Sequence, residues 1–373
     1  MRVLIWVQHL LGAGHLQRAA LLAGALADCG HQVTLVSGGM PRGRDMPAGL
    51  RVVQLPPCRA ADATFKTLLD QDGRPIDDTW RDRRRDQLLA LFDAVAPDVL
   101  VTEHYPFGRR QLRFELTPLI ARARAAGTFV VSSVRDVLVG MDRPDRAAWA
   151  ADRVLADFDR VLVHGDPALL PFAATFPAAG RIADRLVHTG FLVPPTPAGD
   201  RVEGDVVMVS AGGGGAVGGP LFRTALAARP LSAARDLPWR FLVGDARIRA
   251  ELAAIAPSGV QIEGLSNDFV TMLRHCRLSV SQAGYNTVME ITATRARAVV
   301  VPFSEGQESE QQVRAAALAA RGALHLLAEA ALNPATLAAT IDTALAAPPP
   351  PALALDRDGA ARSAALLEGW VGR

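Results

Sequence analysis

The chain contains 373 residues, 50% of them hydrophobic, and its 40 Lys and Arg residues nearly balance 38 Asp and Glu residues, giving a formal net charge of +2. This length exceeds what one hydrophobic core usually supports, so we expect two domains. The small net charge argues against a nucleic-acid-binding protein. The odd number of cysteines, without metal-ligand spacing, indicates free thiols in a reducing cytoplasm.

The first predicted strand and its following turn resemble the start of a nucleotide-binding sheet. Val3–Val7 is an apolar run, and Leu11–Leu16 is a glycine-rich turn into a helix that runs toward Asp28. A dinucleotide site would place a third glycine near position 17 and an acid at the end of the second strand. Gln17 and Ser37 stand at these places, so the sequence disfavours an NAD site.

His15 lies in this turn, where the helix starts. The field of a helix N-terminus disfavours an imidazolium, so we expect a neutral ring that can accept a proton from a hydroxyl group. The alternative is that His15 only packs the turn or hydrogen-bonds a phosphate.

Asp70 and Asp72 have the spacing of a metal-binding pair of carboxylates. They precede Gly73 and Pro75 in a polar stretch rather than follow a strand of a nucleotide-binding domain, which favours a surface loop. We therefore predict no metal site.

Seven arginines give the N-terminal half a local positive charge: Arg81, Arg83, Arg84, Arg85, Arg109, Arg110 and Arg113. They could face an anionic acceptor or an acidic membrane surface. Asp82 and Asp86 are interleaved, which favours a solvated helix with internal ion pairs. No apolar run reaches membrane length, so we expect a cytoplasmic protein with at most peripheral contact to the inner face of the membrane.

Polar residues follow two further predicted strands, residues 98–101 and 128–131. Ligands of open α/β sheets bind beyond the carboxyl ends of strands, so we expect an acceptor site there. Its candidate residues are Glu103, His104, Arg135 and Asp136. Glu103 or Asp136 could replace His15 as a base or orient it. Alternatively, Arg135 and Asp136 pair with each other or with a helix end.

Strands and helices alternate through both halves, which predicts two doubly wound α/β sheets. The proline-rich stretch Phe191–Asp200 reads as a connector, and Pro348–Pro351 as a second break. We assign residues 1–192 to an N-terminal domain, 193–204 to a linker, 205–347 to a C-terminal domain and 352–373 to a terminal helix.

A second glycine cluster, residues 212–219, follows the predicted strand Val206–Ser210. Amide groups exposed by glycine can form an anion site, and residues without a Cβ let a diphosphate approach closely. We predict that Gly213, Gly214 and Gly215 serve this purpose. A Walker loop is excluded because it needs a lysine after its last glycine, and the only lysine is Lys66.

The next motif joins a short apolar strand, Leu278–Ser281, to a helix that we expect Asn286 and Thr287 to cap. Glu290 follows about one turn later, where its carboxylate could accept both hydroxyls of a ribose while the helix N-terminus binds a diphosphate. The alternative for Glu290 is a charge favoured near a positive helix end.

A further apolar strand, Ala298–Pro302, leads through a polar loop to Glu310, Gln311 and Gln312 at the start of an alanine-rich helix. Planar amides and carboxylates at a strand-to-helix junction suit the recognition of sugar hydroxyls. A solvated helix start is the alternative.

These two motifs resemble the C-terminal domain of glycosyltransferase family 28, whose best-known member acts in peptidoglycan synthesis, and more widely the GT-B sugar-nucleotide transferases. The chain is most similar to a bacterial subgroup of predicted glycosyltransferases. The resemblance implies a GT-B fold with two Rossmann-like domains facing a cleft and a C-terminal helix returning to the first domain. Glu290 would hold the ribose of UDP, and Glu310 and Gln311 the donor sugar, with Gln312 as a further sugar contact under a one-residue shift.

The same resemblance extends to the rest of the cleft. It implies that Gly14 and His15 face the acceptor, and that the backbone of Leu265 and Ser266 recognises the uracil edge. The turn and first residues of the donor helix would surround the diphosphate: Ala283, Gly284, Tyr285, Asn286 and Thr287.

We therefore predict an inverting, metal-independent transferase that moves a sugar from a UDP-sugar, of the UDP-N-acetylglucosamine or UDP-hexose type, to a hydroxyl of a lipid-linked, glycan or small-molecule acceptor. No cofactor is expected, and His15 is the favoured base. A non-hydrolysing UDP-sugar 2-epimerase and a catalytically silent sugar-nucleotide-binding protein are the alternatives.

Overall fold

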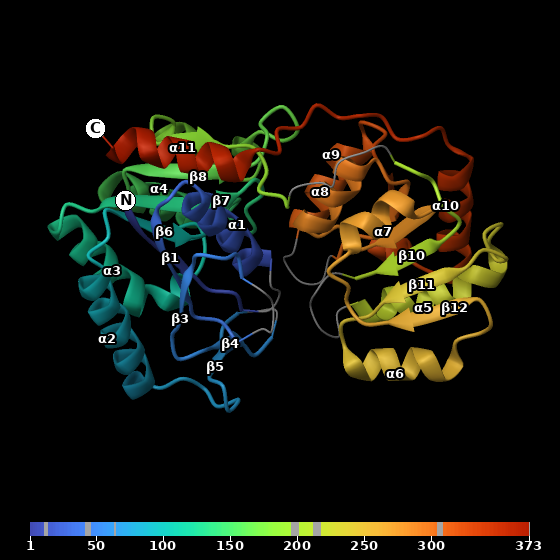
Figure 1. The fold of residues 1–373 in the computed structure, drawn as a ribbon, viewed down its shortest axis with the longest axis horizontal. Coiled ribbons are helices and arrows are strands. Elements are labelled where there is room, and N and C mark those ends of the chain that lie inside the picture. Colours follow the sequence, from blue (N-terminus) through green and yellow to red (C-terminus); the bar gives the residue numbers. More distant parts are fainter. Residues whose placement is uncertain are drawn as a thin grey trace. The chain divides into compact units, whose positions relative to one another are not determined.

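The structure is a computed structural model that describes residues 1–10, 14–41, 46–62, 65–194, 201–211, 218–303 and 309–372. The chain divides into two compact units, residues 1–193 together with 355–373, and residues 194–354 (Figure 1). The predicted diphosphate residues Gly213, Gly214 and Gly215 lie outside the described residues.

The first unit is built on a parallel sheet with the strand order β3-β2-β1-β6-β7-β8-β9. Its strands are β1 Arg2–Val7, β2 Gln32–Ser37, β3 Arg51–Gln54, β6 Val99–Glu103, β7 Phe129–Arg135, β8 Arg160–His164 and β9 Leu186–His188, with a separate antiparallel pair, β4 Arg59–Ala60 and β5 Leu68–Leu69. Its helices are α1 Gly14–Asp28, α2 Asp78–Val95, α3 Arg113–Ala125, α4 Pro144–Asp157 and α11 Gly359–Val371, with short 3₁₀ turns η1 Arg110–Leu112, η2 Phe172–Ala174 and η3 Pro177–Ile182.

The second unit repeats this plan with the strand order β12-β11-β10-β13-β14-β15, again with all neighbouring strands parallel. Its strands are β10 Val207–Ser210, β11 Trp239–Leu242, β12 Val260–Glu263, β13 Leu278–Ser281, β14 Ala298–Val300 and β15 His325–Leu326. Its helices are α5 Gly219–Ala228, α6 Ala246–Ile255, α7 Phe269–His275, α8 Tyr285–Thr294, α9 Glu310–Ala319 and α10 Pro334–Ala346, with 3₁₀ turns η5 Arg229–Leu231 and η6 Glu329–Ala331.

Helices cover both faces of the first sheet because successive side chains of a strand point to opposite faces. Leu4 and Trp6 of β1 belong to a buried cluster with apolar residues of α2, α3 and α4. Val3 and Ile5 belong to a second cluster with α1 and α11. The C-terminal helix, which begins at Gly359, is therefore part of the core of the first unit.

Both sheets have the strand order of nucleotide-binding folds, in which the order reverses beside the first strand. The reversal lies between β1 and β6 in the first unit and between β10 and β13 in the second. Among the described residues, no helix is both long enough and apolar enough to cross a membrane.

Two expected strand ends are wrong. Residues 102 and 103 extend β6, and residues 132–135 extend β7, instead of forming loops after shorter strands. The polar side chains there are compatible with a strand because they find partners inside the unit. The hydroxyl groups of Thr102 and Ser132 both donate to the backbone carbonyl of Tyr105.

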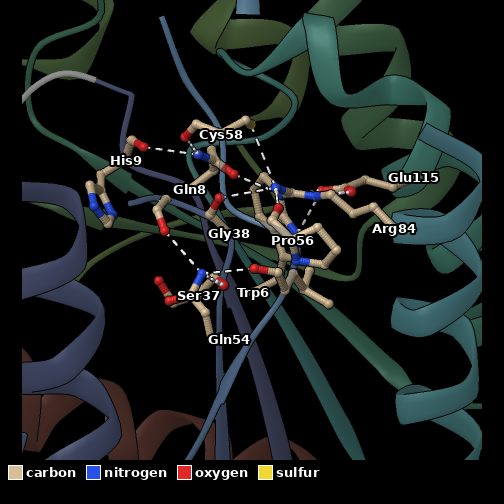
Figure 2. A network of polar contacts seen from close by, with 12 residues as sticks. Trp6, Gln8, His9, Ser37, Gly38, Gln54, Pro56, Cys58, Arg84 and Glu115 are labelled. Atoms are coloured by element: carbon tan, nitrogen blue, oxygen red, sulfur yellow. Dashed lines mark hydrogen bonds and ion pairs between the residues drawn. The ribbon is translucent and has the colours of Figure 1, made fainter. Parts of the chain in front are cut away.

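A buried ion pair ties together the segments at the carboxyl edge of the first sheet (Figure 2). Arg84 of α2 donates to both carboxylate oxygens of Glu115 on α3, at 2.6 and 2.8 Å, and neither side chain is exposed. Its other N–H groups donate to the side-chain oxygen of Gln8 at 2.7 Å and to the backbone carbonyls of Gly38 and Pro56. One guanidinium thus fixes the chain after β1, after β2 and after β3.

Arg84 is also where the interpretation of the arginine run as a solvated helix fails. Trp80, Arg84, Leu88 and Phe92 recur every four residues and form the buried face of α2. Arg81 and Arg85 lie off this face and pair with acids of the same helix, as expected.

Replacing Arg84 by methionine should lower the free energy of unfolding by about 3–5 kcal/mol, because Glu115 would remain as a buried charge without its partner. Urea denaturation followed by circular dichroism measures the loss. The control is Arg122→Met, which removes an equally forked but exposed pair with Asp93 and should cost about 1 kcal/mol or less. Equal losses in the two variants would contradict the role given to Arg84.

Candidate functional site

The predicted base and a predicted carboxylate meet at the carboxyl edge of the first sheet. His15 is the second residue of α1, and Glu103 is the last residue of β6. The Nδ1 atom of His15 lies 2.8 and 2.9 Å from the two carboxylate oxygens of Glu103, which is buried. Because a carboxylate only accepts, we assign the proton to Nδ1 and the basic site of the neutral ring to Nε2; Nη2 of Arg18 also lies 3.0 Å from Nδ1.

Arg18 belongs to the same group, although the sequence interpretation missed it. It lies one turn after His15 on α1, is buried, and donates to a carboxylate oxygen of Glu103 at 2.9 Å. The spacing of three residues on one helix was the signal that could have identified it, because such residues share a face.

Positive neighbours and burial act together on His15. Burial lowers its pKa well below the usual 6.5, and the charges of Arg109, Arg18, Arg135 and His9 lower it further, in that order. His15 is therefore neutral at pH 7. The first unit thus holds an imidazole that stays neutral in water at pH 7 and is free to accept a proton from a hydroxyl group.

His104 stands beside this pair in a strained backbone conformation. Its φ angle is 68°, a region that non-glycine residues rarely adopt, and its ring centroid lies 5.2 Å from that of His15. A Cβ on Gly108 would lie 2.3 Å from the His104 ring, so only glycine leaves it room. Burial lowers the pKa of His104 as well, followed by the charge of His15.

The two predicted acceptor residues at the end of β7 differ in their surroundings. Arg135 is the last residue of the strand, and its charge acts on both His15 and His104. Asp136 follows it, is buried, and packs so closely on Gly165 that any Cβ there would clash with it. Contact of either residue with an acceptor stays a prediction.

A third buried imidazole, His164, lies at the end of β8. Its Nε2 atom is 2.7 Å from the hydroxyl of Ser133, and its Nδ1 atom is 2.9 Å from the hydroxyl of Thr189. Burial lowers the pKa of His164 to about 3. This ring joins three neighbouring strand ends through hydroxyl groups.

Arg110 and Arg113 stack on the ring of Trp149, with guanidinium carbons 4.7 and 5.8 Å from the ring centroid. Arg109 donates to the backbone carbonyl of Gln8 at 2.8 Å. These three arginines of the predicted run therefore contribute to the packing of the first unit.

The carboxylate pair of the sequence lies in a turn after β5. Asp70 accepts hydrogen bonds from the backbone N–H groups of Asp72 and Arg74, both at 2.9 Å. Within the described ranges, no group of three or more His, Cys, Asp and Glu side chains is arranged to hold a metal ion.

The second unit places the donor motif at the reversal of its strand order. Helix α8 begins at Tyr285, before both residues expected to cap it, and Gly284 is its N-cap without a capping side chain. The expected cap by Asn286 and Thr287 is therefore wrong, because both residues lie within the first turn. An N-terminus without a capping side chain keeps backbone N–H groups that can bind an anion.

Two buried hydroxyl groups lie at the same place. Ser210 ends β10 and Ser281 ends β13, and the two residues pair in register across the reversal. The side-chain oxygens of both are buried, and neither has a hydrogen-bond partner among the residues that the structure describes. Buried hydroxyls are usually paired, so these two have capacity for a ligand.

The remaining predicted donor residues lie in helix α8 and in the segments that follow β12 and β13. Glu290 lies half-buried in the second turn of α8. Leu265 and Ser266 follow β12, and Leu265 is half exposed. Ala283 is buried in the turn before α8.

Helix α9 carries the last three candidates. Glu310 is only 4% exposed and accepts from Arg314 at 2.8 Å. The side-chain oxygen of Gln311 accepts from the backbone N–H of Phe303 at 3.1 Å, and Gln312 is half-buried. Sugar contacts of all three stay predictions.

Known proteins resemble this chain in sequence and in fold. Residues 258–363 match the glycosyltransferase family 28 C-terminal domain. A UDP-N-acetylglucosamine--N-acetylmuramyl-(pentapeptide) pyrophosphoryl-undecaprenol N-acetylglucosamine transferase of Synechococcus sp. (strain RCC307) is 30% identical over 167 residues, 43% of this chain and 44% of that protein. The chain spans about half or less of the length of the curated relatives it matches first.

Two solved structures resemble the whole chain. The calicheamicin glycosyltransferase CalG4 has a TM-score of 0.61 at 18% identity, covering 100% of this chain and 99% of that one. MurG of Acinetobacter baumannii has a TM-score of 0.59 at 18% identity, covering 99% and 100%.

This is a family 28-like chain with the GT-B fold. The predicted fold class and the predicted resemblance are both confirmed. In this GT-B chain the first sheet carries the His15–Glu103 pair, and the second carries the family 28 motif at α8 and α9.

The buried imidazoles of the GT-B chain predict a stability that decreases in acid. His164 binds a proton with a pKa of about 3 when folded and 6.5 when unfolded, so the unfolded state gains protons first as the pH falls below 6.5. Between pH 6.5 and 5 this single group should remove about 2 kcal/mol of stability. Urea unfolding at pH 6.5 and at pH 5 measures the loss of stability between these pH values. In His164→Gln this loss should be smaller than in the wild type by the contribution of His164. The assignment of this pH dependence to His164 would be contradicted if His164→Gln lost as much stability between the two pH values as the wild type. It would also be contradicted if the control His275→Gln, at an exposed histidine, reduced the loss as much as His164→Gln.

Proposed function

We propose that this protein transfers a sugar from a UDP-sugar to an acceptor hydroxyl with inversion at the anomeric carbon and without a metal ion. The observation that carries the proposal is the His15–Glu103 pair at the carboxyl edge of the first sheet, in a chain whose second unit matches family 28. A buried carboxylate that orients a neutral imidazole is an arrangement suited to general base catalysis.

The proposed reaction assigns one role to each group. The acceptor oxygen attacks the anomeric carbon while the bond from that carbon to the β-phosphate oxygen of UDP breaks. The acceptor proton passes to Nε2 of His15, and the carboxylate of Glu103 stabilises the imidazolium that forms. Burial, and after it the charges of Arg109 and Arg18, keeps the pKa of His15 low and so favours return of the proton to solvent.

The second unit would bind the donor. Backbone N–H groups of the first turn of α8 would bind the diphosphate, with the hydroxyls of Ser210 and Ser281 below it. The carboxylate of Glu290 would accept the ribose hydroxyls. The uridine nucleotide and an N-acetylglucosamine-type sugar are inferred from the names of the relatives, which are UDP-N-acetylglucosamine transferases.

The acceptor and the location belong to the same proposal. The relatives are named for a pyrophosphoryl-undecaprenol acceptor, which supports a lipid-linked acceptor for this chain. A cytoplasmic protein that contacts the inner face of the membrane would meet such an acceptor. We assign acceptor binding to Gly14, His104 and Arg135 in the first unit.

The donor class can be tested directly by thermal shift. A ligand that binds only the folded state raises the melting temperature, so UDP, GDP and dTDP can be ranked at equal concentration. UDP should give the largest shift. An absence of any shift with uridine nucleotides would refute the proposal, and NMR detection of an epimerised UDP-sugar without acceptor would replace it by the epimerase.

His15→Ala should lower kcat by about 10²–10⁴-fold with little change in UDP affinity, because the general base is lost while the donor site is intact. The rate of the wild type should decline only well below pH 6.5, since the ring must be neutral and its pKa is lowered. UDP release measured across pH checks both expectations.

The matched control for His15 is His31→Ala. His31 forms the same kind of pair with Glu368, at 2.8 Å, but precedes β2 at the opposite edge of the sheet. Its removal should leave kcat unchanged. Unchanged turnover in His15→Ala would withdraw the base assignment.

Glu290→Ala should weaken UDP binding by about 10–100-fold, since hydrogen bonds to a charged group contribute about 1.5–3 kcal/mol. Calorimetry with UDP and with 2′,3′-dideoxy-UDP separates this contact from a general loss. Only UDP should lose affinity. Equal loss for both nucleotides would show that Glu290 supports the helix instead of the ribose.

A further inference from the structure

The starts of helices α8 and α9 are joined by a buried cation. Arg314 of α9 has no exposed surface, donates to Glu310 one turn earlier at 2.8 Å, and lies over the ring of Tyr285 with its guanidinium carbon 5.0 Å from the centroid. Tyr285 is the first residue of α8 and is itself buried. The three side chains connect the first turns of the two helices that carry the family 28 motif.

Burying this ion pair has a cost that surface pairs do not have. Both charges leave water, and their mutual attraction offsets the loss only when the geometry is close and fixed. Glu310 is 4% exposed, so its carboxylate is held inside the unit instead of being presented to solvent. A carboxylate held in this way is better suited to fixing the helix than to following the hydroxyls of a mobile sugar.

The neighbouring amides gain from this arrangement. Gln311 follows Glu310 directly, and its side-chain oxygen accepts from the backbone N–H of Phe303, beyond the end of β14. That bond fixes the plane of the carboxamide. Because the oxygen is engaged, the amino group is the part of Gln311 with donors to offer a ligand. The first turn of α9 is thus held at Glu310 by Arg314 and at Gln311 by the strand end.

We propose that Arg314 is the positioning residue of the donor-sugar site: through Glu310 and Tyr285 it sets the first turn of α9 against α8, so that Gln311 and Gln312 meet the sugar. This assignment rests on the proposed function. It gives Glu310 a role through Arg314 in place of the direct sugar contact that the sequence predicts.

The role has a distinct signature in binding. A group that orients only the sugar-binding amides should change the affinity for a UDP-sugar but hardly that for UDP, which ends at the diphosphate. A residue that only stabilises the unit would weaken both ligands in parallel or neither. The ratio of the two dissociation constants therefore separates the two roles.

Calorimetry with UDP, UDP-N-acetylglucosamine and UDP-glucose on the full chain tests the proposal. Arg314→Gln should reduce the affinity for the preferred UDP-sugar about 10-fold and that for UDP less than 2-fold. Glu310→Gln should also reduce the affinity for the UDP-sugar more than that for UDP. The double variant should bind the UDP-sugar no more weakly than the single variant with the lower affinity, because both substitutions break the same ion pair. Arg314→Lys keeps the charge without the planar fork and should recover part of the loss.

The control is Arg223→Gln, which removes an exposed pair with Glu251 elsewhere in the second unit. It should leave both affinities unchanged. Equal weakening of UDP and UDP-sugar in Arg314→Gln, or unchanged binding of both, would overturn the positioning role. If Arg314→Gln does not fold, Glu310→Gln and Arg314→Lys decide by the same ratio.

Failure of the proposed function would be recognised separately. A wild-type protein that binds neither UDP nor either UDP-sugar refutes the transferase and this inference with it. If the wild-type protein binds UDP-sugars and Arg314→Gln does not alter the ratio of the dissociation constants for UDP and UDP-sugar, only the inference is refuted.

Discussion

The ion pair between Arg84 and Glu115 is the constraint on which the first unit most depends. The carboxyl edge of a parallel sheet is where ligands bind, yet the chain leaving each strand there has no ladder to hold it. One buried guanidinium supplies that support to the segments after β1, β2 and β3 (Figure 2). The segment after β1 precedes helix α1, which carries His15, the proposed base.

The same device recurs at both candidate sites. Among the described residues, the buried glutamates are Glu103, Glu115 and Glu310, and each accepts from an arginine that is itself buried. In each case the arginine belongs to a helix beside the sheet. A buried carboxylate without such a partner would be strongly unfavourable, so the paired arginine is what allows each of these carboxylates to be fixed inside its unit.

The two units differ in the kind of charge that surrounds their candidate sites. Around His15, burial and then nearby cations lower the pKa and keep the imidazole neutral, which suits a base. Around the start of α8 it leaves backbone N–H groups and two serine hydroxyls, which suit an anion without a fixed counter-charge. A leaving diphosphate is bound by such dipoles without the desolvation cost of a full buried cation.

Local sequence patterns determined the alternation of strands and helices, because periodicity and turn residues are properties of neighbouring positions. They placed His15 at a helix start, Glu103 near a strand end and Glu290 in the helix after a strand, and the resemblance of two motifs to a known family supplied the GT-B fold class. Only the tertiary structure decided that Glu103 contacts His15, 88 positions away in the sequence. It also decided that Arg84, alone in its run of charged residues, is buried in the core. In the second unit it decided that Glu310 pairs with Arg314 and that Gly284 is the N-cap of α8. These outcomes depend on strand order and on which helix face meets the sheet, and contacts between distant segments set both.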